Sequence, residues 1–255
     1  PSIDVENPDF NIHIHISNDR CNLYINSSGD SLHKRGYRLE TNEAPISEAL
    51  AAGLILLSGW DKKSHFVDGM CGSGTFLVEA AMIGANIPAN INREHFAFQD
   101  WPDYDEELWH LIRSSQLKRA QDCYGRVIGY DLNPDTVASA KLNIANSGLE
   151  DYIEIHCENF FETKKPEGPT HLVFNPPYGV RIQGDIPEMY KSIGDTLKKN
   201  YSGAEAWFLT SHMDGLKHVG LRASRKIEIY QAKLECRFVK YEMYQGSKKM
   251  KYKQV

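Results

Sequence analysis

Several features that would classify a chain at once are missing from this sequence of 255 residues. No apolar run reaches about 18 residues and no signal-peptide pattern occurs, so neither a membrane-spanning helix nor secretion is expected. The five cysteines are odd in number, scattered and never spaced C-x-x-C, which argues against a disulfide framework and a zinc site. The ten histidines form no H-x-x-x-H pair. We therefore expect a soluble, cytoplasmic protein without a bound metal or a membrane partner.

The common phosphate-binding motifs are also missing. Neither the dinucleotide motif G-x-G-x-x-G nor the P-loop motif G-x-x-x-x-G-K-[ST] occurs. A net charge of −5 argues against nucleic-acid binding over the whole surface, although lysines and arginines cluster at residues 34–38 and 248–253. With 41% apolar and 25% charged residues, the composition is that of a globular protein with one substantial core.

The most informative motif that is present is Asn175-Pro176-Pro177-Tyr178, which directly follows the apolar residues 171–174. The apolar run predicts a buried strand, and the prolines end it because each lacks an amide donor and restricts the residue before it. The backbone there is expected to be stiff and to have free carbonyl acceptors. An asparagine oxygen, a proline carbonyl and a tyrosine ring in one place suit a flat heterocycle that carries an exocyclic amino group.

A glycine-rich turn lies between a predicted strand at residues 64–67 and a predicted helix at residues 76–83. Its glycines allow the backbone to turn tightly and to approach a ligand, and the helix start adds unpaired amides. A nucleotide phosphate loop is one interpretation. The other is the D-x-x-C-G-S-G-T loop of methyltransferases that bind S-adenosylmethionine, in which the acidic residue comes first. The residues concerned are Asp68, Gly69, Cys71, Gly72, Ser73, Gly74 and Thr75.

Two further predicted strands end in polar side chains. Residues 127–130 lead to Asp131, whose carboxylate could accept both hydroxyls of a ribose, while the neighbouring Asn133 could cap the next helix. Asp131 lies much farther from Asp68 than the usual gap of about 20 residues, because residues 86–124 form an insertion.

Residues 152–157 form the second of these strands and lead to Glu158 and Asn159. In a site for S-adenosylmethionine, a side chain at this position accepts a hydrogen bond from the adenine amino group. Asn159 can do so through its amide oxygen, and Glu158 is the alternative.

The alternation of predicted strands and helices indicates an α/β fold with a mostly parallel sheet that is covered on both faces. The last two strands are too close together for a crossover, so they are expected to be antiparallel. The candidate site residues all follow strands, where ligands bind in such sheets. The remaining predicted elements are strands at residues 10–16, 21–26, 204–210, 226–234 and 236–245 and helices at residues 44–58, 104–123, 135–147, 188–199 and 215–219.

Residues 31–38 (Ser-Leu-His-Lys-Arg-Gly-Tyr-Arg) and 44–52, with the Asp68 loop and the Asn175 motif, resemble the THUMP-associated RNA guanine-N2 methyltransferases. The chain is most similar to the bacterial enzymes that modify 23S ribosomal RNA, over about residues 19–250. The Asn-Pro-Pro-Tyr motif alone is shared with adenine-N6 DNA and glutamine-N5 protein methyltransferases, and the His-Lys-Arg-Gly-Tyr-Arg segment narrows the resemblance to the RNA family. It implies a Rossmann-like class I methyltransferase with a seven-stranded sheet, S-adenosylmethionine as cofactor and a guanine N2 in RNA as methyl acceptor.

The resemblance also implies a role for each candidate residue. The catalytic residues would be Asn175, Pro176, Pro177 and Tyr178. Cofactor contacts would come from the glycine-rich loop and from Asp131, Asn159, Asn175 and Pro45. Contacts to RNA phosphate or to the cofactor carboxylate would come from His33, Lys34, Arg35 and Arg38.

In domain terms, residues 1–30 would be the closing hairpin of a THUMP RNA-binding domain, and residues 31–255 the methyltransferase domain. Because the chain begins at Pro1, most of the THUMP domain is expected to precede it. Three alternatives stay open at this point: a tRNA guanine-N2 methyltransferase, a DNA adenine-N6 methyltransferase, and an RNA-binding module without activity.

Overall fold

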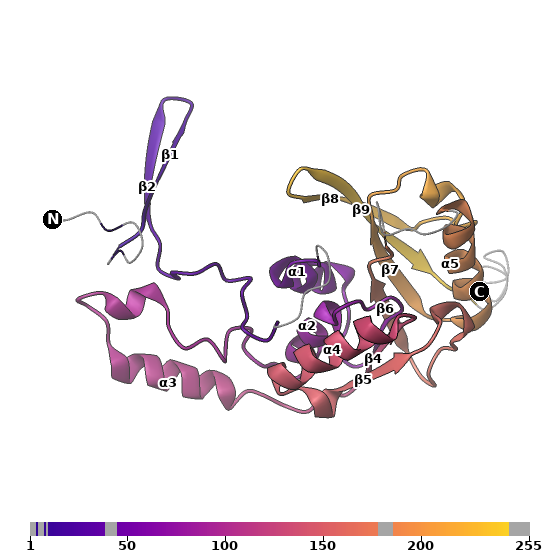
Figure 1. Ribbon diagram of the computed structural model, residues 1–255, viewed down its shortest axis with the longest axis horizontal. Coiled ribbons are helices and arrows are strands. Elements are labelled where there is room, and N and C mark those ends of the chain that lie inside the picture. The colour runs from indigo at the N-terminus through magenta and orange to yellow at the C-terminus, as the bar shows by residue number, and fades with distance from the viewer. Residues whose placement is uncertain (1–3, 5–7, 9, 39–44, 178–185, 245–255) are drawn as a thin grey trace, which may run out of the picture.

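A seven-stranded sheet forms the centre of the protein (Figure 1). The computed structural model describes residues 4, 8, 10–38, 45–177 and 186–244. The strand order is β5-β4-β3-β6-β7-β9-β8; the first five of these are parallel, and β9 is antiparallel to both of its neighbours. This confirms the predicted α/β fold with an antiparallel C-terminal pair. The strands are β3 His65–Asp68, β4 Val127–Asp131, β5 Ile153–Cys157, β6 Thr170–Phe174, β7 Glu205–Thr210, β8 Arg225–Gln231 and β9 Leu234–Glu242.

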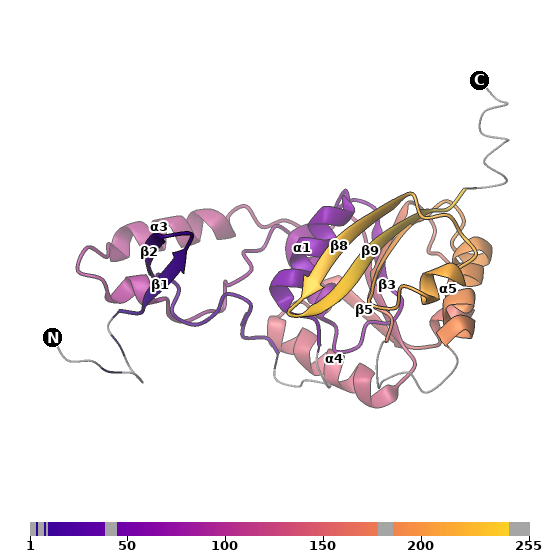
Figure 2. The ribbon, with the colours of Figure 1, turned by 90° about the horizontal axis from the view of Figure 1, so that it is seen from above.

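Helices cover both faces of this sheet (Figures 1 and 2). Each face has its own hydrophobic core. On one face lie α1 (Glu48–Ser58), α2 (Thr75–Gly84) and α4 (Pro134–Ser147), and on the other lies α5 (Ile186–Asn200). The middle strands β3, β4 and β6 are therefore buried along nearly their whole length. Within the described residues, no helix has the length and apolar character needed to span a membrane. The short 3-10 helices are η1 Ala97–Asp100, η2 Glu150–Tyr152, η3 Phe160–Glu162 and η5 Gly215–Lys217.

The order of the strands reverses at β3. From β3 the chain moves outward to β4 and then β5, and it returns to β6 on the other side of β3. Loops that leave adjacent strands at such a reversal run in opposite directions and leave room for a ligand between them. The end of β3 at Asp68 and the residue after β6, Asn175, are therefore on either side of this reversal.

A smaller unit projects from the sheet and contains the β1–β2 hairpin and α3 (Figures 1 and 2). Its elements are β1 Ile12–Ser17, β2 Arg20–Ile25 and α3 Glu106–Leu117. The amide of Phe98 donates to the carbonyl of Ser27 at 2.9 Å, and Nη2 of Arg93 donates to the carbonyls of Ser28 and Asp30 at 2.8 and 2.9 Å. The inserted residues 86–124 thus pack against the segment that follows the hairpin.

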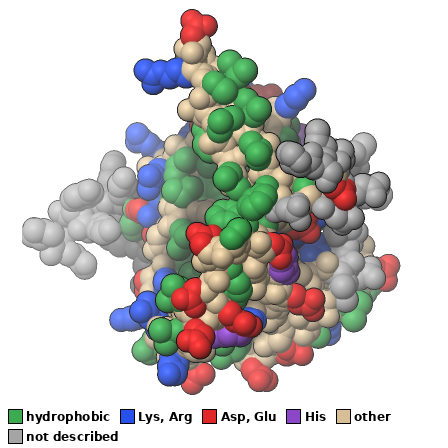
Figure 3. All heavy atoms as spheres, turned by 90° about the vertical axis from the view of Figure 1, so that its left-hand side faces the viewer, with side chains coloured by type: hydrophobic (Ala, Val, Ile, Leu, Met, Phe, Trp, Pro, Cys, Tyr) green, Lys and Arg blue, Asp and Glu red, His purple; other side chains and the backbone are tan. Residues whose placement is uncertain are grey.

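One face of the β1–β2 hairpin is apolar and exposed. Ile12 lies opposite Ile25 and Ile14 lies opposite Leu23, which places all four on the same face, and each is at least 57% exposed. Figure 3 shows hydrophobic side chains gathered along this projecting end of the molecule. A contiguous apolar face of this kind is typical of an interaction surface.

Two predicted helix boundaries are wrong. The helix predicted at residues 44–58 begins at Glu48, because the Ser47 hydroxyl accepts a hydrogen bond from the amide of Leu50 at 3.3 Å and caps it; Ala44 lies outside the described residues. The helix predicted at residues 104–123 is only α3. Asp105 caps its start, and after Leu117 the chain turns back toward the end of α2.

The predicted boundary between the last two strands is also wrong. The chain turns at Ala232, which has a φ of 53°, so Leu234 belongs to β9 instead of the strand before it. This turn is not marked by glycine, which is why the sequence places it too late. The helix predicted at residues 215–219 is a single 3-10 turn, and the predicted end at Gln245 lies outside the described residues.

Candidate functional site

Four of the candidate residues come together at one edge of the sheet. The strands β5, β4, β3 and β6 are adjacent and parallel, so their carboxyl ends share an edge. Asp68 ends β3 and Asp131 ends β4, while Asn159 and Asn175 follow β5 and β6 closely. The topology thus gathers side chains that are more than 100 residues apart in the sequence.

The glycine-rich turn is held between β4 and α2. The amide of Cys71 donates to the carbonyl of Tyr130 at 2.9 Å, and the amide of Gly72 donates to Oδ2 of Asp131 at 3.0 Å. Gly72 and Gly74 have φ values of 54° and 84°, in the left-handed region that favours glycine. Gly74 caps α2 without a side-chain hydrogen bond, which leaves the first amides of the helix to other acceptors.

Neighbouring side chains also fix the position of this turn. A Cβ on Gly69 would lie 2.5 Å from the ring of Phe160, so only glycine fits there. Asn143 of α4 is fully buried, and its Nδ2 donates to the carbonyl of Ser73 at 3.1 Å. The sequence alone does not reveal this role of Asn143, because nothing in its surroundings distinguishes it from other polar residues of an amphipathic helix.

Asp68 and Cys71 are both buried within the turn. Asp68 is 1% exposed, and its Oδ1 accepts a hydrogen bond from the amide of Met70 at 3.1 Å. Burial raises the pKa of Asp68 well above its usual range, and the nearby charge of Asp131 adds to this shift. Burial likewise raises the pKa of the Cys71 thiol. In this geometry Asp68 shapes the turn, and Cys71 is an uncharged part of its packing.

Asp131 is partly exposed and keeps acceptor capacity. Its Oδ2 accepts from Gly72, and its Oδ1 accepts from the amide of Asn133 at 3.0 Å. A carboxylate offers about four lone-pair sites, so two remain for a ligand. Asn133 caps α4, as its position before Pro134 suggested, with its Oδ1 accepting from the amide of Asp135 at 2.9 Å.

Asn159 caps the short helix η3. Its Oδ1 accepts from the amide of Phe161 at 3.1 Å, while its Nδ2 lies 3.4 Å from Oε1 of Glu162. Its side chain is half-buried, whereas Glu158 is exposed. Asn159 is thus the more fixed of the two adenine candidates.

Asn175 has an unusual environment. Its Oδ1 is buried, and among the described residues no donor reaches it. A buried oxygen without a hydrogen bond costs about 1–3 kcal/mol, so such an atom calls for an explanation. Pro176 is buried and Pro177 half-buried beside it, while Tyr178 lies outside the described residues.

The basic segment at residues 33–38 contains both exposed and largely buried side chains. His33 and Lys34 are exposed, but the side chains of Arg35 and Arg38 are only 10% and 13% exposed. Nη2 of Arg38 donates to Oγ1 of Thr75 at 2.7 Å. The two arginines thus turn toward α2, whereas His33 and Lys34 face the solvent.

In α2, Glu79 is the partner of both Arg35 and Tyr37, and it was not among the residues predicted from the sequence. Its side chain is 1% exposed, its Oε1 accepts from Oη of Tyr37 at 3.1 Å, and Nε of Arg35 lies 3.4 Å away. Burial raises the pKa of Glu79 to about 7, against the opposing effects of Arg35 and Tyr37. A single carboxylate in an otherwise apolar helix was the sign that could have revealed it.

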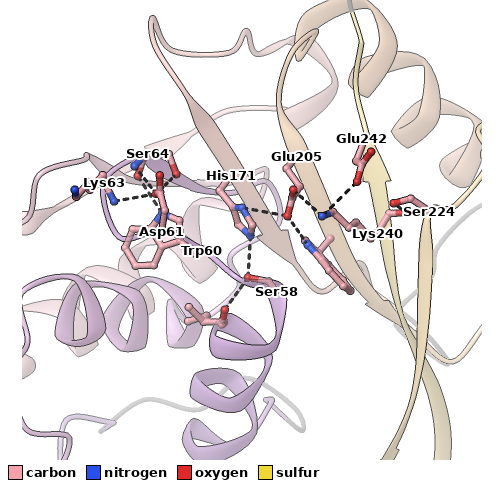
Figure 4. Close-up of polar contacts among 12 residues, drawn as sticks. Ser58, Trp60, Asp61, Lys63, Ser64, His171, Glu205, Ser224, Lys240 and Glu242 are labelled. Atoms are coloured by element: carbon pink, nitrogen blue, oxygen red, sulfur yellow. Dashed lines mark hydrogen bonds and ion pairs between the residues drawn. The ribbon is translucent and has the colours of Figure 1, made fainter. Parts of the chain in front are cut away.

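A second polar cluster lies at the opposite edge of the sheet (Figure 4). Nε2 of His171 is 2.8 Å from Oγ of Ser58, and Nδ1 of His171 is 3.6 Å from Oε1 of Glu205. The order of hydroxyl, imidazole and carboxylate resembles a hydrolytic triad. However, Ser58 is 3% exposed and its hydroxyl donates to the carbonyl of Ile55 at 2.7 Å, so this cluster connects α1 to the sheet and offers no accessible nucleophile.

Among the described residues, no three His, Cys, Asp or Glu side chains are placed to hold a metal ion. The polar groups of the candidate site are instead hydrogen-bond acceptors and backbone amides. They suit an organic ligand with hydroxyl and amino groups.

Comparison with known proteins identifies relatives along most of the chain. The family described as "RMKL-like, methyltransferase domain" matches residues 35–240. The chain is 34% identical to the ribosomal RNA large subunit methyltransferases K/L of Shewanella frigidimarina and Methylococcus capsulatus, over 97% and 95% of its length. It spans only 36% and 34% of those two relatives, and 64% of a Synechocystis protein assigned as an RNA methyltransferase, which is 35% identical to it.

Solved structures that resemble this chain are also described as methyltransferases. A protein assigned as a methyltransferase and crystallised with SAH is 35% identical to this chain, with a TM-score of 0.85 over 93% of this chain and 63% of the other. A Listeria monocytogenes protein described as a predicted N6-adenine-specific DNA methylase is 32% identical, with a TM-score of 0.83 over 93% of this chain and 61% of the other. The chain therefore belongs to the family of RMKL-like methyltransferase domains.

Proposed function

We propose that the protein transfers a methyl group from S-adenosylmethionine to the exocyclic N2 of a guanine in RNA, most specifically in large-subunit ribosomal RNA. Its family, its relatives named as ribosomal RNA methyltransferases and the related structure with SAH support this assignment. The single observation that carries it is the buried Oδ1 of Asn175, which has no donor among the described residues.

The residues at the sheet edge fit the proposed cofactor. The free lone pairs of Asp131 suit the ribose hydroxyls, and the amide oxygen of Asn159 suits the adenine amino group. The left-handed glycines Gly72 and Gly74 let the turn approach the ligand closely, and the proposed contact Pro45 lies two residues before Ser47, which caps α1. When bound, S-adenosylmethionine supplies an electrophilic methyl group on a sulfonium.

Asn175 and Pro176 are proposed to act on the amine that receives the methyl group. An exocyclic guanine amine has two hydrogens, and its lone pair is delocalised into the ring. Hydrogen bonds from this amine to Oδ1 of Asn175 and to the carbonyl of Pro176 favour a nitrogen whose lone pair is available, and they hold it in place for transfer. The proton is acidic only after methylation and can leave to solvent, so no general base is required.

Tyr178 and Pro177 complete the proposed acceptor site. An aromatic ring after the two prolines would stack on the target base, which has to be unpaired or flipped out of its helix. Pro177 fixes the backbone between Asn175 and Tyr178, because its φ angle is restricted by the ring.

The projecting unit is proposed to be the end of an RNA-binding domain of THUMP type. The exposed apolar face of the β1–β2 hairpin is suited to packing against further residues of such a domain. The inserted residues 86–124 would belong to this unit as well, since they bind the segment after the hairpin. His33 and Lys34 are exposed in the connection and are the proposed RNA contacts there.

Two measurements test the proposed function. Calorimetry should detect binding of S-adenosylmethionine, and a protein that binds no cofactor would contradict enzymatic activity and favour an RNA-binding module. Transfer of tritiated methyl groups to ribosomal RNA, followed by nucleoside analysis, should then yield N2-methylguanosine. Label in N6-methyladenosine would instead contradict transfer to guanine N2 and favour transfer to an adenine amino group, the acceptor in the Listeria relative's description.

A further inference from the structure

The segment that follows the hairpin is joined to the first two turns of α2. Arg38 donates to Oγ1 of Thr75, while Arg35 and Tyr37 both contact Oε1 of Glu79. Thr75 and Glu79 are four residues apart, so they lie on the same face of the helix. We call Arg35, Tyr37 and Arg38 the arginine clamp.

The guanidinium of Arg38 also joins a third part of the chain. Its Nη2 donates to the carbonyl of Ile46 at 2.9 Å, and its Nε lies 3.6 Å from Oε1 of Glu48 in the first turn of α1. One side chain thus fixes the starts of α1 and α2 relative to each other. A planar guanidinium with five donors is suited to such a junction, and a lysine is not.

The clamp is buried and its charges are balanced. Two arginines face two carboxylates, and the side chains of Glu48 and Glu79 are 5% and 1% exposed. Buried ion pairs of this kind stabilise a fold weakly, yet removing one partner leaves a costly unpaired charge. We therefore attribute to these two ion pairs a role in positioning the segments that they join, more than a contribution to the stability of the fold.

The clamp meets the candidate cofactor site at Thr75. Thr75 directly follows Gly74, whose left-handed conformation ends the glycine-rich turn. Helix α4 contacts both the clamp and the glycine-rich turn. Nδ2 of Asn146 donates to the carbonyl of Tyr37 at 3.2 Å, and Nδ2 of Asn143 donates to the carbonyl of Ser73. A shift of residue 38 would be transmitted to the turn through one hydrogen bond.

The geometry points to Arg38 as a positioning residue that holds the Gly72–Thr75 turn in its ligand-binding conformation, with Arg35 and Tyr37 fixing α2 behind it. This inference rests on the proposed function for the identity of the ligand, S-adenosylmethionine. It differs from the sequence expectation, in which the same arginines contact RNA phosphate or the cofactor carboxylate directly.

The first experiment compares Arg38→Gln with Arg126→Gln as a matched control. Arg126 also pairs with a glutamate, Glu154, but its side chain is 53% exposed. We expect Arg38→Gln to raise the dissociation constant of S-adenosylmethionine about tenfold and to leave RNA affinity and its salt dependence unchanged. The control should change neither. Unchanged cofactor affinity with weakened RNA binding would overturn the inference and make Arg38 an RNA contact.

A second pair of variants avoids the unpaired Glu48 that Arg38→Gln leaves. Thr75→Val removes the hydroxyl with little change of shape, whereas Thr75→Ser retains it. We expect weaker cofactor binding for Val and near-normal binding for Ser. In a double-mutant cycle, Thr75→Val should have little further effect once Arg38 is Gln. Fully additive effects would mean that Thr75 acts on the ligand without Arg38.

A third measurement does not require the cofactor. Amide hydrogen exchange at residues 72–79 should be faster in Arg38→Gln than in the original protein, while exchange in β3 and β4 stays the same. Unchanged exchange at these residues would refute the positioning role even if the cofactor is something else. Conversely, Arg38→Gln could show faster exchange although the original protein binds no S-adenosylmethionine. That result would support the positioning role of Arg38 and refute the proposed function.

Discussion

Replacing Asn175 with alanine should make the protein more stable and at the same time inactive. The Oδ1 of Asn175 is buried and has no donor among the described residues, and a buried oxygen that makes no hydrogen bond costs about 1–3 kcal/mol. Alanine removes this oxygen, and the loss of packing offsets about 1 kcal/mol of the gain. We expect a net increase of about 1 kcal/mol in the free energy of unfolding, which is a rise of about 2–4 °C in Tm for a protein of this size.

The effect on function should be the reverse. Asn175 is proposed to contact the target amine and to contribute little to cofactor affinity, so the dissociation constant of S-adenosylmethionine should stay within about threefold. Methyl transfer should fall at least about a hundredfold, the lower range for losing one preorganised polar contact. Scanning calorimetry, cofactor titration and tritiated methyl transfer measure the three quantities on the same preparation.

Asn133→Ala is the matched control for this experiment. The Oδ1 of Asn133 is satisfied by the amides of Asp135 and Thr136 at the start of α4. Removing that cap should lower stability by about 1 kcal/mol, opposite in sign to Asn175→Ala. A fall of Tm in Asn175→Ala together with near-normal turnover would refute the reasoning, because it would mean that Asn175 only supports the loop.

Three further predictions follow from the described contacts. Asp131→Ala should weaken S-adenosylmethionine binding by about 1.5–3 kcal/mol in calorimetry, the scale for hydrogen bonds to a charged group, and an unchanged dissociation constant would remove Asp131 from the site. Gly194→Ala should lower the free energy of unfolding by about 3 kcal/mol or more in urea titration, because its Cβ would overlap the backbone carbonyl of Val219; Gly53→Ala, where nothing lies within 4 Å, should instead stabilise α1 by about 0.5–1 kcal/mol. Burial lowers the pKa of His171 to about 4, below the 6.5 of the unfolded chain, so the native state binds fewer protons between these values. Its contribution to stability should be complete above about pH 6.5 and be lost as the pH falls toward 4, and His171→Gln should remove this part of the pH dependence of unfolding.

Local patterns in the sequence were sufficient for the sheet and for the positions of the polar residues at its edge. The apolar strands, the glycine turn before α2 and the prolines after Phe174 each act over a few residues, and their geometry is dictated by backbone sterics. Because parallel strands share one carboxyl edge, the expectation that Asp68, Asp131 and Asn175 lie at that edge followed from order alone.

Contacts between distant segments were decided only by the tertiary structure. The sequence led us to expect that Arg35 and Arg38 contact RNA phosphate or the cofactor carboxylate, and it could not reveal that Glu48 and Glu79 face them from two helices. The sequence likewise did not predict that the inserted residues 86–124 pack against the segment that follows the β1–β2 hairpin. Pairing of this kind depends on how α1, α2 and the N-terminal segment pack, and one-dimensional periodicity carries no information on which polar side chains meet.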